Sequence, residues 1–447
     1  MWGQRSNFVG LPTDCPQRDE RLGWSADAQV FWRAASYNMD LTAFSRKFSG
    51  DLRATQVGTA MFGIYAPGTN LINPGYGTGW SDAGVVIPWT SWIQTGDRAV
   101  VDQNWDAMKN YLAAIHEANP DYLWKKNYGI PFADWLAPEG VTPVDLIATA
   151  YWAYDVTLMK QMASATGRTA EAAEYGELFG KIKEAFVKAY THPDGWVGGV
   201  PPPPVFASGT QTSLAGQPVE TQTGYVLAIN MNLVPESLRK AAGQRLADRI
   251  AANHGQLGTG FLGTPYLLAA LTDTGHLDVA YHLLLDTEYP SWGYLVEHGA
   301  TTMWERWNGD QMRKDPSMNS YNHYAYGAVA DWVYRYAAGI DTVSSDAGFH
   351  TIYLHPNFSD ALGAVNFSYE SRYGTIRSEW SVEGGKASWK LTIPANSSGR
   401  LPAAVADGLR LDGKELAGNP RVHVMHDGGE TVYEVPAGSY AFEATLK

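Results

Sequence analysis

A dense group of charged and aromatic side chains lies near the start of the chain. Its members are Asp14, Arg18, Asp19, Glu20, Arg21, Trp24 and Asp27. Pro16 and Gly23 restrict the backbone on either side of Glu20, and Trp24 is a large apolar group to leave in water. A rigid loop with carboxylates, a guanidinium and an indole suits a site that binds and cleaves sugars. The alternative interpretation is a solvated, charged surface.

Glycoside cleavage requires one protonated carboxyl group to protonate the leaving oxygen, and a second carboxylate on the opposite face of the sugar. Glu20 is a candidate for the acid because neighbouring negative charge favours the protonated form of a carboxyl group. We expect Arg18 to keep one neighbour, most simply Asp14, ionised so that it can bind hydroxyl groups.

A second candidate stretch begins at Glu297 and ends at Trp307. Glu297 and Glu305 could each supply the second carboxylate, and the residues alone do not separate them. The flanking Trp304 and Trp307 favour Glu305 in an aromatic pocket, whereas a surface ion pair with Arg306 is the alternative.

Two further groups have both a structural and a chemical interpretation. A lone helical histidine is usually a core residue, but His323 lies near Asn319 and Asn322 and could bind a sugar hydroxyl. Cys15 is the only cysteine, which excludes an intramolecular disulfide and a zinc site built on cysteine pairs. No partner for a thiol nucleophile is evident, so we expect Cys15 to pack.

The composition is that of a large globular protein with two domains of unequal size. The chain has 447 residues, of which 45% are hydrophobic, 18% charged and 13% aromatic. The net charge of −13 argues against nucleic acid as a partner and favours a neutral substrate. No apolar run approaches the ~20 residues of a membrane span, and the first residues lack the apolar region of a signal peptide. The expected location is cytoplasmic, and the abrupt start suggests missing upstream sequence.

Helical periodicity dominates the first three quarters of the chain. It predicts about eleven helices, over residues 24–38, 40–54, 81–95, 97–117, 143–165, 169–190, 221–231, 235–253, 263–272, 276–286 and 320–338. They form pairs, and the loops that look functional fall between pairs. Six hairpins closed into an (α/α)6 barrel need about twelve helices. The missing one is expected before Trp2, and an open helical array is the alternative.

The last part of the chain reads as β structure. Segments 350–354, 364–369, 374–380, 387–393 and 431–435 alternate with period two and are separated by turn residues. We predict a catalytic barrel over residues 1–340 and an antiparallel β-sandwich over residues 341–447. The second domain carries no cluster of catalytic groups, so we interpret it as structural.

Three segments together resemble a known family. They are Asp14–Trp24 (DCPQRDERLGW), Gly299–Trp307 (GATTMWERW) and Asn319–Ala328 (NSYNHYAYGA). They resemble signature segments of the bacterial α-L-rhamnosidases of glycoside hydrolase family 78. The stretches at 133–136 and 260–264 fit the same order along the helical part.

The resemblance implies an (α/α)6 barrel followed by a β-sandwich, and hydrolysis of terminal α-L-rhamnosyl groups with inversion. By motif position, Glu20 would be the general acid and Glu305 the base that activates water. The substrate-binding residues implied are Asp14, Arg18, Trp24, Asp27, Trp80, Asp82, Trp135, Trp304 and His323. No metal or cofactor is required. Family members normally carry β domains ahead of the barrel, and because the sequence begins almost at the first motif we expect this chain to lack them.

Further expectations concern the partners of the protein and the loops around the site. Rhamnosylated small molecules or oligosaccharides are the expected partners, no membrane is expected, and a second copy of the chain could cover the N-terminal edge in a homodimer. Aglycone contacts are expected in the loops at 68–79 and 198–216. The alternative functions are another (α/α)6 glycosidase and a truncated fragment that binds rhamnosides with little activity.

Overall fold

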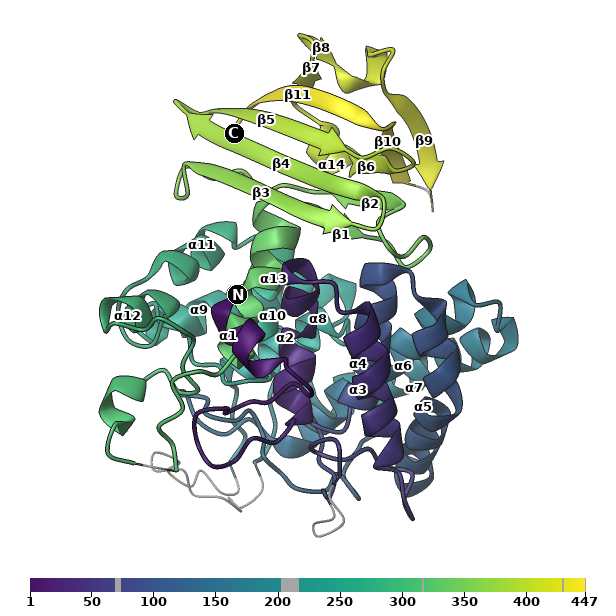
Figure 1. Cartoon of the computed structure of the whole chain (residues 1–447), viewed down its shortest axis with the longest axis vertical. Coiled ribbons are helices and arrows are strands. Elements are labelled where there is room, and N and C mark those ends of the chain that lie inside the picture. Colours follow the sequence, from purple (N-terminus) through teal and green to yellow (C-terminus); the bar gives the residue numbers. More distant parts are fainter. Residues whose placement is uncertain (69–73, 202–216, 316, 428–429, 447) are drawn as a thin grey trace. The chain divides into compact units, whose positions relative to one another are not determined.

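The structure is a computed structural model that describes residues 1–68, 74–201, 217–315, 317–427 and 430–446 (Figure 1). The chain forms two compact units. The first comprises Met1–Ala35, Ala43–Trp89 and Ala99–Val329, and the second comprises Ser36–Thr42, Thr90–Arg98 and Ala330–Lys447. Parts of the two loops expected to contact an aglycone, 69–73 and 202–216, lie outside the described residues.

Helices make up most of the first unit. The α-helices are α1 (Trp2–Asn7), α2 (Ser25–Asn38), α3 (Thr42–Ala54), α4 (Ala83–Thr95), α5 (Arg98–Ala118), α6 (Val144–Ala165), α7 (Thr169–Tyr190), α8 (Gln222–Asn230), α9 (Glu236–Ala252), α10 (Thr264–Asp273), α11 (Leu277–Leu285), α12 (Trp292–Glu297) and α13 (Val329–Trp332). Short 3₁₀ helices are η1 (Gly309–Met312) and η2 (Ala325–Ala328). The π-helix η3 (Val333–Ala337) and most of α13 belong to the second unit.

The long helices alternate between an inner and an outer layer. Helices α2, α4, α6 and α8 are buried on almost every side, as expected for helices that are apolar all round. Helices α7 and α9, in contrast, bury a single stripe and expose charged residues elsewhere. Consecutive pairs pack together, as α6 does with α7, α8 with α9 and α10 with α11. This is the (α/α)6 arrangement predicted from the pairs of helices.

The first ten predicted helices are confirmed to within a few residues. The eleventh, predicted over 320–338, is confirmed in its later part, but it begins only at Ala325 and ends at Ala337. The backbone at Ser320 and His323 is held by a neighbouring segment: Glu305 N–H donates to Ser320 O at 3.1 Å, and His323 N–H donates to Met303 O at 2.8 Å. Because these groups are used across segments, regular helix begins only later, as η2, α13 and η3. Helices α1 and α12 were not predicted, because each has only 6 residues.

The second unit contains two β-sheets and a short helix, α14 (Ala403–Ala406). The strands are β1 (Ile340–Thr342), β2 (Thr351–Leu354), β3 (Ala364–Ser371), β4 (Gly374–Glu383), β5 (Lys386–Ile393), β6 (Ser398–Pro402), β7 (Leu409–Leu411), β8 (Lys414–Glu415), β9 (His423–Asp427), β10 (Glu430–Val435) and β11 (Gly438–Thr445), and η4 (Leu416–Gly418) is a 3₁₀ turn. The sheet orders are β1-β2-β6-β10-β9 and β3-β4-β5-β11-β7-β8.

Antiparallel pairing dominates both sheets, as predicted, and only β2 with β6 pairs in parallel within the described residues. Trp380 lies opposite Trp389 across β4 and β5, and both are buried. They belong to one apolar core that alternates with exposed residues along the strands, which is the period-two pattern of the sequence.

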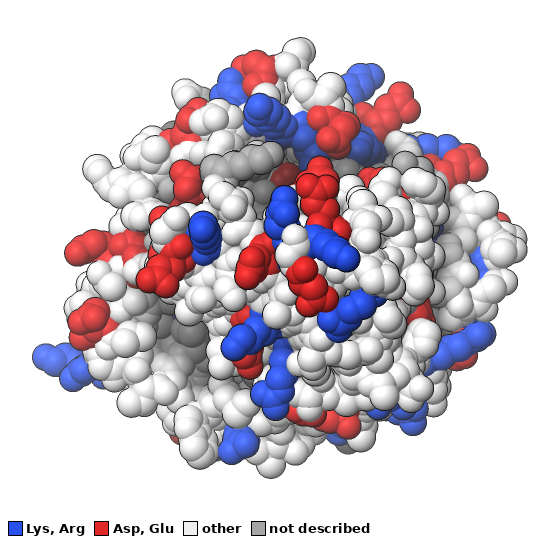
Figure 2. Space-filling view, turned by 90° about the horizontal axis from the view of Figure 1, so that it is seen from above, with Lys and Arg blue, Asp and Glu red and all other residues white. Residues whose placement is uncertain are grey.

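Among the described residues, no helix has the length and apolar character to span a bilayer. On the face shown in Figure 2, Lys and Arg side chains are mixed with Asp and Glu and form no extended basic patch among the described residues.

Candidate active site

A cavity of about 230 Å³ lies in the helical unit, where loops between helix pairs meet. This is smaller than the ~300–1,000 Å³ of sites for drug-sized ligands and suits one sugar ring. Its walls are formed by Asp14, Arg18, Glu20, Trp24, Asp27, Trp80, Phe132, Trp135, Phe261, Glu305, Ser317 and Met318. Most of these residues belong to loops that lead from an outer helix into the next inner helix, as predicted from the sequence.

The loop between α1 and α2 carries the first group of site residues. Its ends are closed by backbone hydrogen bonds, from Asp14 N–H to Leu22 O at 3.2 Å and from Ala66 N–H to Gly23 O at 3.0 Å. A Cβ atom at Gly23 would lie 2.3 Å from Ala66 O, so no larger residue fits there. This close approach fixes the chain directly before Trp24 and explains the glycine in the motif.

Arg18 joins the two candidate catalytic carboxylates. Its Nη2 and Nε donate to Glu20 Oε2 at 2.5 and 3.1 Å, and its Nη1 donates to Glu305 Oε2 at 2.9 Å. One guanidinium therefore holds both groups, and its planar fork limits the distance between the two Oε2 atoms to about 8 Å. The expectation that Arg18 pairs with Asp14 is wrong, and Glu20 is surrounded less by carboxylates than by Arg18 and Trp24, whose Nε1 donates to Glu20 Oε1 at 2.6 Å.

The geometry separates the two candidates for the second carboxylate. Glu305 is buried, lines the cavity and pairs with Arg18, so it is not a surface partner of Arg306. Glu297, at the end of α12, is exposed and does not line the cavity. Among the described residues, Glu305 Oε1 has no hydrogen-bond partner and is available to a ligand or water.

Asp14, Asp27 and His323 form a buried group beside the carboxylates. Burial raises the pKa of Asp14 to about 7, and the charges of Asp27 and Glu20 add to this effect, whereas His323 opposes it. Asp14 Oδ1 is buried and has no hydrogen-bond partner in the described part of the chain. His323 Nε2 lies 3.0 Å from Asp27 Oδ1, and although burial would lower the pKa of His323, Asp27 raises it.

Cys15 lies between these groups. Its Sγ is 4.0 Å from Glu305 Oε2, and burial, together with the charges of Asp14 and Glu305, raises the pKa of the thiol, which is therefore neutral. This agrees with a packing role and with the absence of a thiolate nucleophile.

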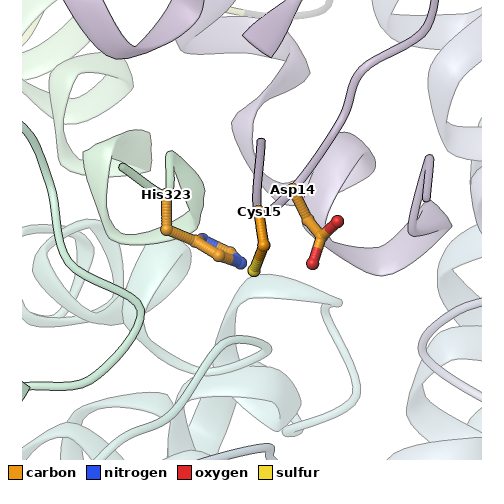
Figure 3. Close-up of side chains that lie close together, drawn as sticks. All are labelled: Asp14, Cys15 and His323. Atoms are coloured by element: carbon orange, nitrogen blue, oxygen red, sulfur yellow. The ribbon is translucent and has the colours of Figure 1, made fainter. Parts of the chain in front are cut away.

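Asp14, Cys15 and His323 also come close enough to be considered as metal ligands. Figure 3 shows the His323 ring and the Cys15 thiol pointing toward each other with Asp14 beyond the thiol, and one ligand atom from each lies within 4.8 Å of the others. However, Ala325 N–H donates to His323 Nδ1 at 3.2 Å, so the proton of the neutral ring is on Nε2, which faces Asp27. A protonated Nε2 cannot ligate a cation, and we assign no metal here.

Aromatic rings form a second part of the cavity wall, which adjoins the charged groups at Trp24 and Glu20. The ring centroid of Phe132 lies 4.4 Å from that of Trp80, 5.9 Å from that of Trp24 and 6.1 Å from that of Trp135. Such a wall offers flat apolar surface to the C–H faces of a sugar, while the carboxylates bind hydroxyl groups.

Three predicted substrate-binding residues do not line the cavity. Asp82 is fully buried, and its carboxylate accepts from Gly79 N–H at 2.6 Å and from the Tyr111 hydroxyl at 3.0 Å, so the predicted direct contact is corrected. Trp304 is buried and packs edge-to-face on Tyr321, which corrects its prediction too. His323 is also buried, and its contact with the cavity is indirect, because its Nε2 pairs with Asp27, which lines the cavity.

The other predicted site residues all line the cavity. They are Asp14, Arg18, Glu20, Trp24, Asp27, Trp80, Trp135 and Glu305. Phe132, Phe261, Ser317 and Met318 were missed. The only available signal was the proximity of Phe132 to Trp135, and of Phe261 to the glycines around it.

The raised pKa of Asp14 predicts a pH-dependent stability difference. Between about pH 4 and pH 7 the folded state keeps the Asp14 proton that the unfolded state has lost, so the free energy of unfolding falls as pH rises. Asp14→Asn lacks this titration. We expect the variant to gain stability relative to the wild type from pH 5 to pH 8, by on the order of 1 kcal/mol or more.

Melting temperatures of both proteins across this pH range test the prediction. Asp19→Asn, on the same loop but with an almost fully exposed side chain, is the control and should show a constant difference. If the melting temperature of Asp14→Asn also differed from that of the wild type by the same amount at every pH, a raised pKa of Asp14 in the folded state would be contradicted.

An (α/α)6 barrel with two carboxylates and an aromatic wall at one cavity defines the class of six-hairpin glycosidases. Comparisons with known proteins place the chain within this class. The family model of the bacterial alpha-L-rhamnosidase 6 hairpin glycosidase domain matches residues 1–337. The family model of the bacterial alpha-L-rhamnosidase C-terminal domain matches residues 339–414. The chain therefore belongs to the bacterial α-L-rhamnosidase family, as its motifs suggested.

Individual relatives cover nearly the whole chain. An alpha-L-rhamnosidase of Streptomyces avermitilis is 38% identical over 99% of this chain and 40% of its own length, and one of Formosa agariphila is 32% identical over 99% and 47%. The crystal structure of the Streptomyces avermitilis enzyme complexed with L-rhamnose gives a TM-score of 0.83 at 37% identity, over 99% of this chain and 40% of that one. The structure of the alpha-L-rhamnosidase from Dictyoglumus thermophilum gives a TM-score of 0.81 at 30% identity, over 99% of this chain and 48% of that one. The chain thus spans less than half the length of these relatives.

Proposed function

We propose that the protein is an α-L-rhamnosidase that removes terminal α-L-rhamnosyl groups with inversion of configuration. The observation that carries this proposal is the bridge formed by Arg18 between Glu20 and Glu305 at one small cavity. Inverting glycosidases place their carboxyl groups ~6.5–9.5 Å apart, which leaves room for a water molecule. The upper limit of about 8 Å set by Arg18 lies within this range.

In this mechanism Glu305 is the base and Glu20 the acid. Glu305 takes a proton from a water molecule, whose oxygen attacks the anomeric carbon from the face opposite the leaving group. The bond to the glycosidic oxygen breaks, and this oxygen receives the proton of Glu20. The products are the free alcohol and rhamnose of inverted configuration, and a proton exchanged through solvent restores both carboxyl groups.

Substrate binding has a role in preparing the acid. Glu20 accepts hydrogen bonds on both oxygens, from Arg18 and from Trp24. Within the residues that the structure describes, Oε1 accepts only from Trp24, so its second lone pair can carry the proton. We infer that a rhamnose hydroxyl takes over an Arg18 N–H, which weakens the hold of the guanidinium on Glu20 and favours the protonated form.

Specificity for rhamnose is supported by the aromatic wall. Rhamnose carries a methyl group where most hexoses carry a hydroxymethyl group. Phe132 and Phe261 offer no hydrogen-bond partner to a hydroxyl at this position, and leaving a buried hydroxyl unpaired costs binding free energy.

One experiment tests reaction and stereochemistry together. We expect the protein to hydrolyse p-nitrophenyl α-L-rhamnoside, with β-L-rhamnose as the first product seen by ¹H NMR before mutarotation. The α anomer as first product would exclude a single displacement. Turnover of other aryl glycosides instead would indicate another (α/α)6 glycosidase, and rhamnose binding without turnover a binding fragment.

A second assignment of the acid is favoured by one observation. Asp14 lines the cavity, and its pKa of about 7 keeps a proton near neutral pH. If Asp14 were the donor, Asp14→Asn rather than Glu20→Gln would lose most activity on substrates with poor leaving groups.

A further inference from the structure

Asp134, in the loop between α5 and α6, accepts an unusual number of hydrogen bonds. Its Oδ2 accepts from the Thr223 hydroxyl at 2.5 Å and from Gly260 N–H at 2.7 Å. Its Oδ1 accepts from Leu262 N–H at 2.7 Å and from Gly263 N–H at 3.3 Å. The side chain is buried and does not line the cavity.

These bonds join the two loops that carry much of the aromatic wall. Phe132 and Trp135 lie on the loop of Asp134, and Phe261 lies on the loop that provides three of its donors. The backbones touch as well, because Phe261 N–H donates to Trp135 O at 3.0 Å. A Cβ atom at Gly260 would lie 2.1 Å from Trp135 O, so the loops cannot come closer.

The negative charge of the Asp134 carboxylate is favourable at its position near the N-terminal end of α10. Leu262 and Gly263 directly precede α10, and the N-cap position of α10 has no side-chain cap of its own. A carboxylate from another loop therefore satisfies the two backbone N–H groups directly before this helix end and interacts favourably with the helix dipole. Burial raises the pKa of Asp134, and the four hydrogen bonds oppose this rise.

We propose that Asp134 is a positioning residue for the cavity, whose carboxylate holds Trp135 and Phe261 at the spacing that a sugar ring requires. The inference rests on the proposed function, because it assigns the cavity to a sugar. It differs from a general role in folding, because the donors of Asp134 sit beside residues that line the cavity.

Asp134→Asn is the informative variant. An amide has one acceptor oxygen, and its NH₂ group would face either Gly260 N–H or the N–H groups of Leu262 and Gly263. At least one backbone donor is left without a partner, and the loops separate. Thr223→Val removes only the hydroxyl donor and keeps the charge, so its effect should be smaller and in the same direction.

The matched control is Asp145→Asn on α6. Asp145 is half-buried and accepts from the Tyr190 hydroxyl at 2.8 Å, but neither residue lines the cavity. We expect Asp134→Asn to raise KM for p-nitrophenyl α-L-rhamnoside and Kd for L-rhamnose about tenfold or more, with kcat changed less than about threefold. Thr223→Val should raise both by about threefold, and Asp145→Asn should leave both unchanged even where it lowers the melting temperature.

Near-UV circular dichroism of the free proteins gives a readout without substrate. We expect Asp134→Asn, but not Asp145→Asn, to change the tryptophan bands. Unchanged Kd, KM and bands in folded Asp134→Asn would overturn the proposal, and so would equal effects of both variants. If Asp134→Asn does not fold, the same measurements on Thr223→Val test the proposal, and unchanged KM and Kd in that variant would overturn it. Failure of the wild type to bind or cleave rhamnosides, with the band difference present, would contradict the proposed function instead.

Discussion

Glu305→Gln is expected to lower kcat by about 10³-fold on every rhamnoside, whatever its leaving group. A glutamine keeps the size of the side chain but cannot take a proton from water. Within the described parts of the chain, Glu305 Oε1 receives no protein donor, so the loss falls on the atom that would meet the water. Steady-state kinetics on p-nitrophenyl and methyl α-L-rhamnoside measure the effect.

Controls for this variant come from the same chain. Glu297→Gln changes the exposed glutamate that the sequence could not exclude, and it should keep full activity. Glu305→Ala opens space beside the anomeric carbon, and added azide should form β-L-rhamnosyl azide, the product of attack with inversion. Normal turnover by Glu305→Gln, or loss of activity in Glu297→Gln, would refute the assignment of the base.

Much of the site could be predicted because it is local in sequence. Asp14, Arg18, Glu20, Trp24 and Asp27 lie on one loop and the first turns of one helix, and all of them line the cavity. Residue type and a backbone restricted at Gly23 were enough to indicate their chemistry.

The partners of these residues could not be predicted from spacing. Arg18 pairs with Glu305, 287 positions away, and not with the nearby Asp14. Such a contact depends on how the barrel closes. Asp82 has the right residue type for a sugar ligand, but it points into the core and binds Tyr111.

The aromatic wall shows a different limit. Phe132 and Phe261 are apolar residues in loops, and apolar residues occur in loops for many reasons. Periodicity predicts helices with a buried face, and it therefore succeeded for the long helices from α2 to α11. For the helix predicted over 320–338 it placed the start too early, because backbone groups at Ser320 and His323 pair with residues 303–305 and the helix begins only at Ala325.

Glu20→Gln is expected to produce a loss that depends on the leaving group. Protonation by Glu20 matters little when the leaving group is p-nitrophenolate, which departs as an anion, and much when it is an alkoxide. We expect about a tenfold to hundredfold loss of kcat/KM on p-nitrophenyl α-L-rhamnoside and about 10³-fold or more on methyl α-L-rhamnoside. The ratio of the two losses, measured in the same buffer, identifies the acid.

The control for Glu20→Gln is Asp19→Asn, which alters the adjacent carboxylate but has a side chain that lies almost fully in solvent. It should leave both substrates unaffected. Because Glu20 also accepts from Arg18 and Trp24, a purely structural effect of the substitution would lower both activities by the same factor. Equal losses on the two substrates would therefore remove Glu20 from the role of acid, and a larger loss on methyl rhamnoside in Asp14→Asn would transfer that role to Asp14.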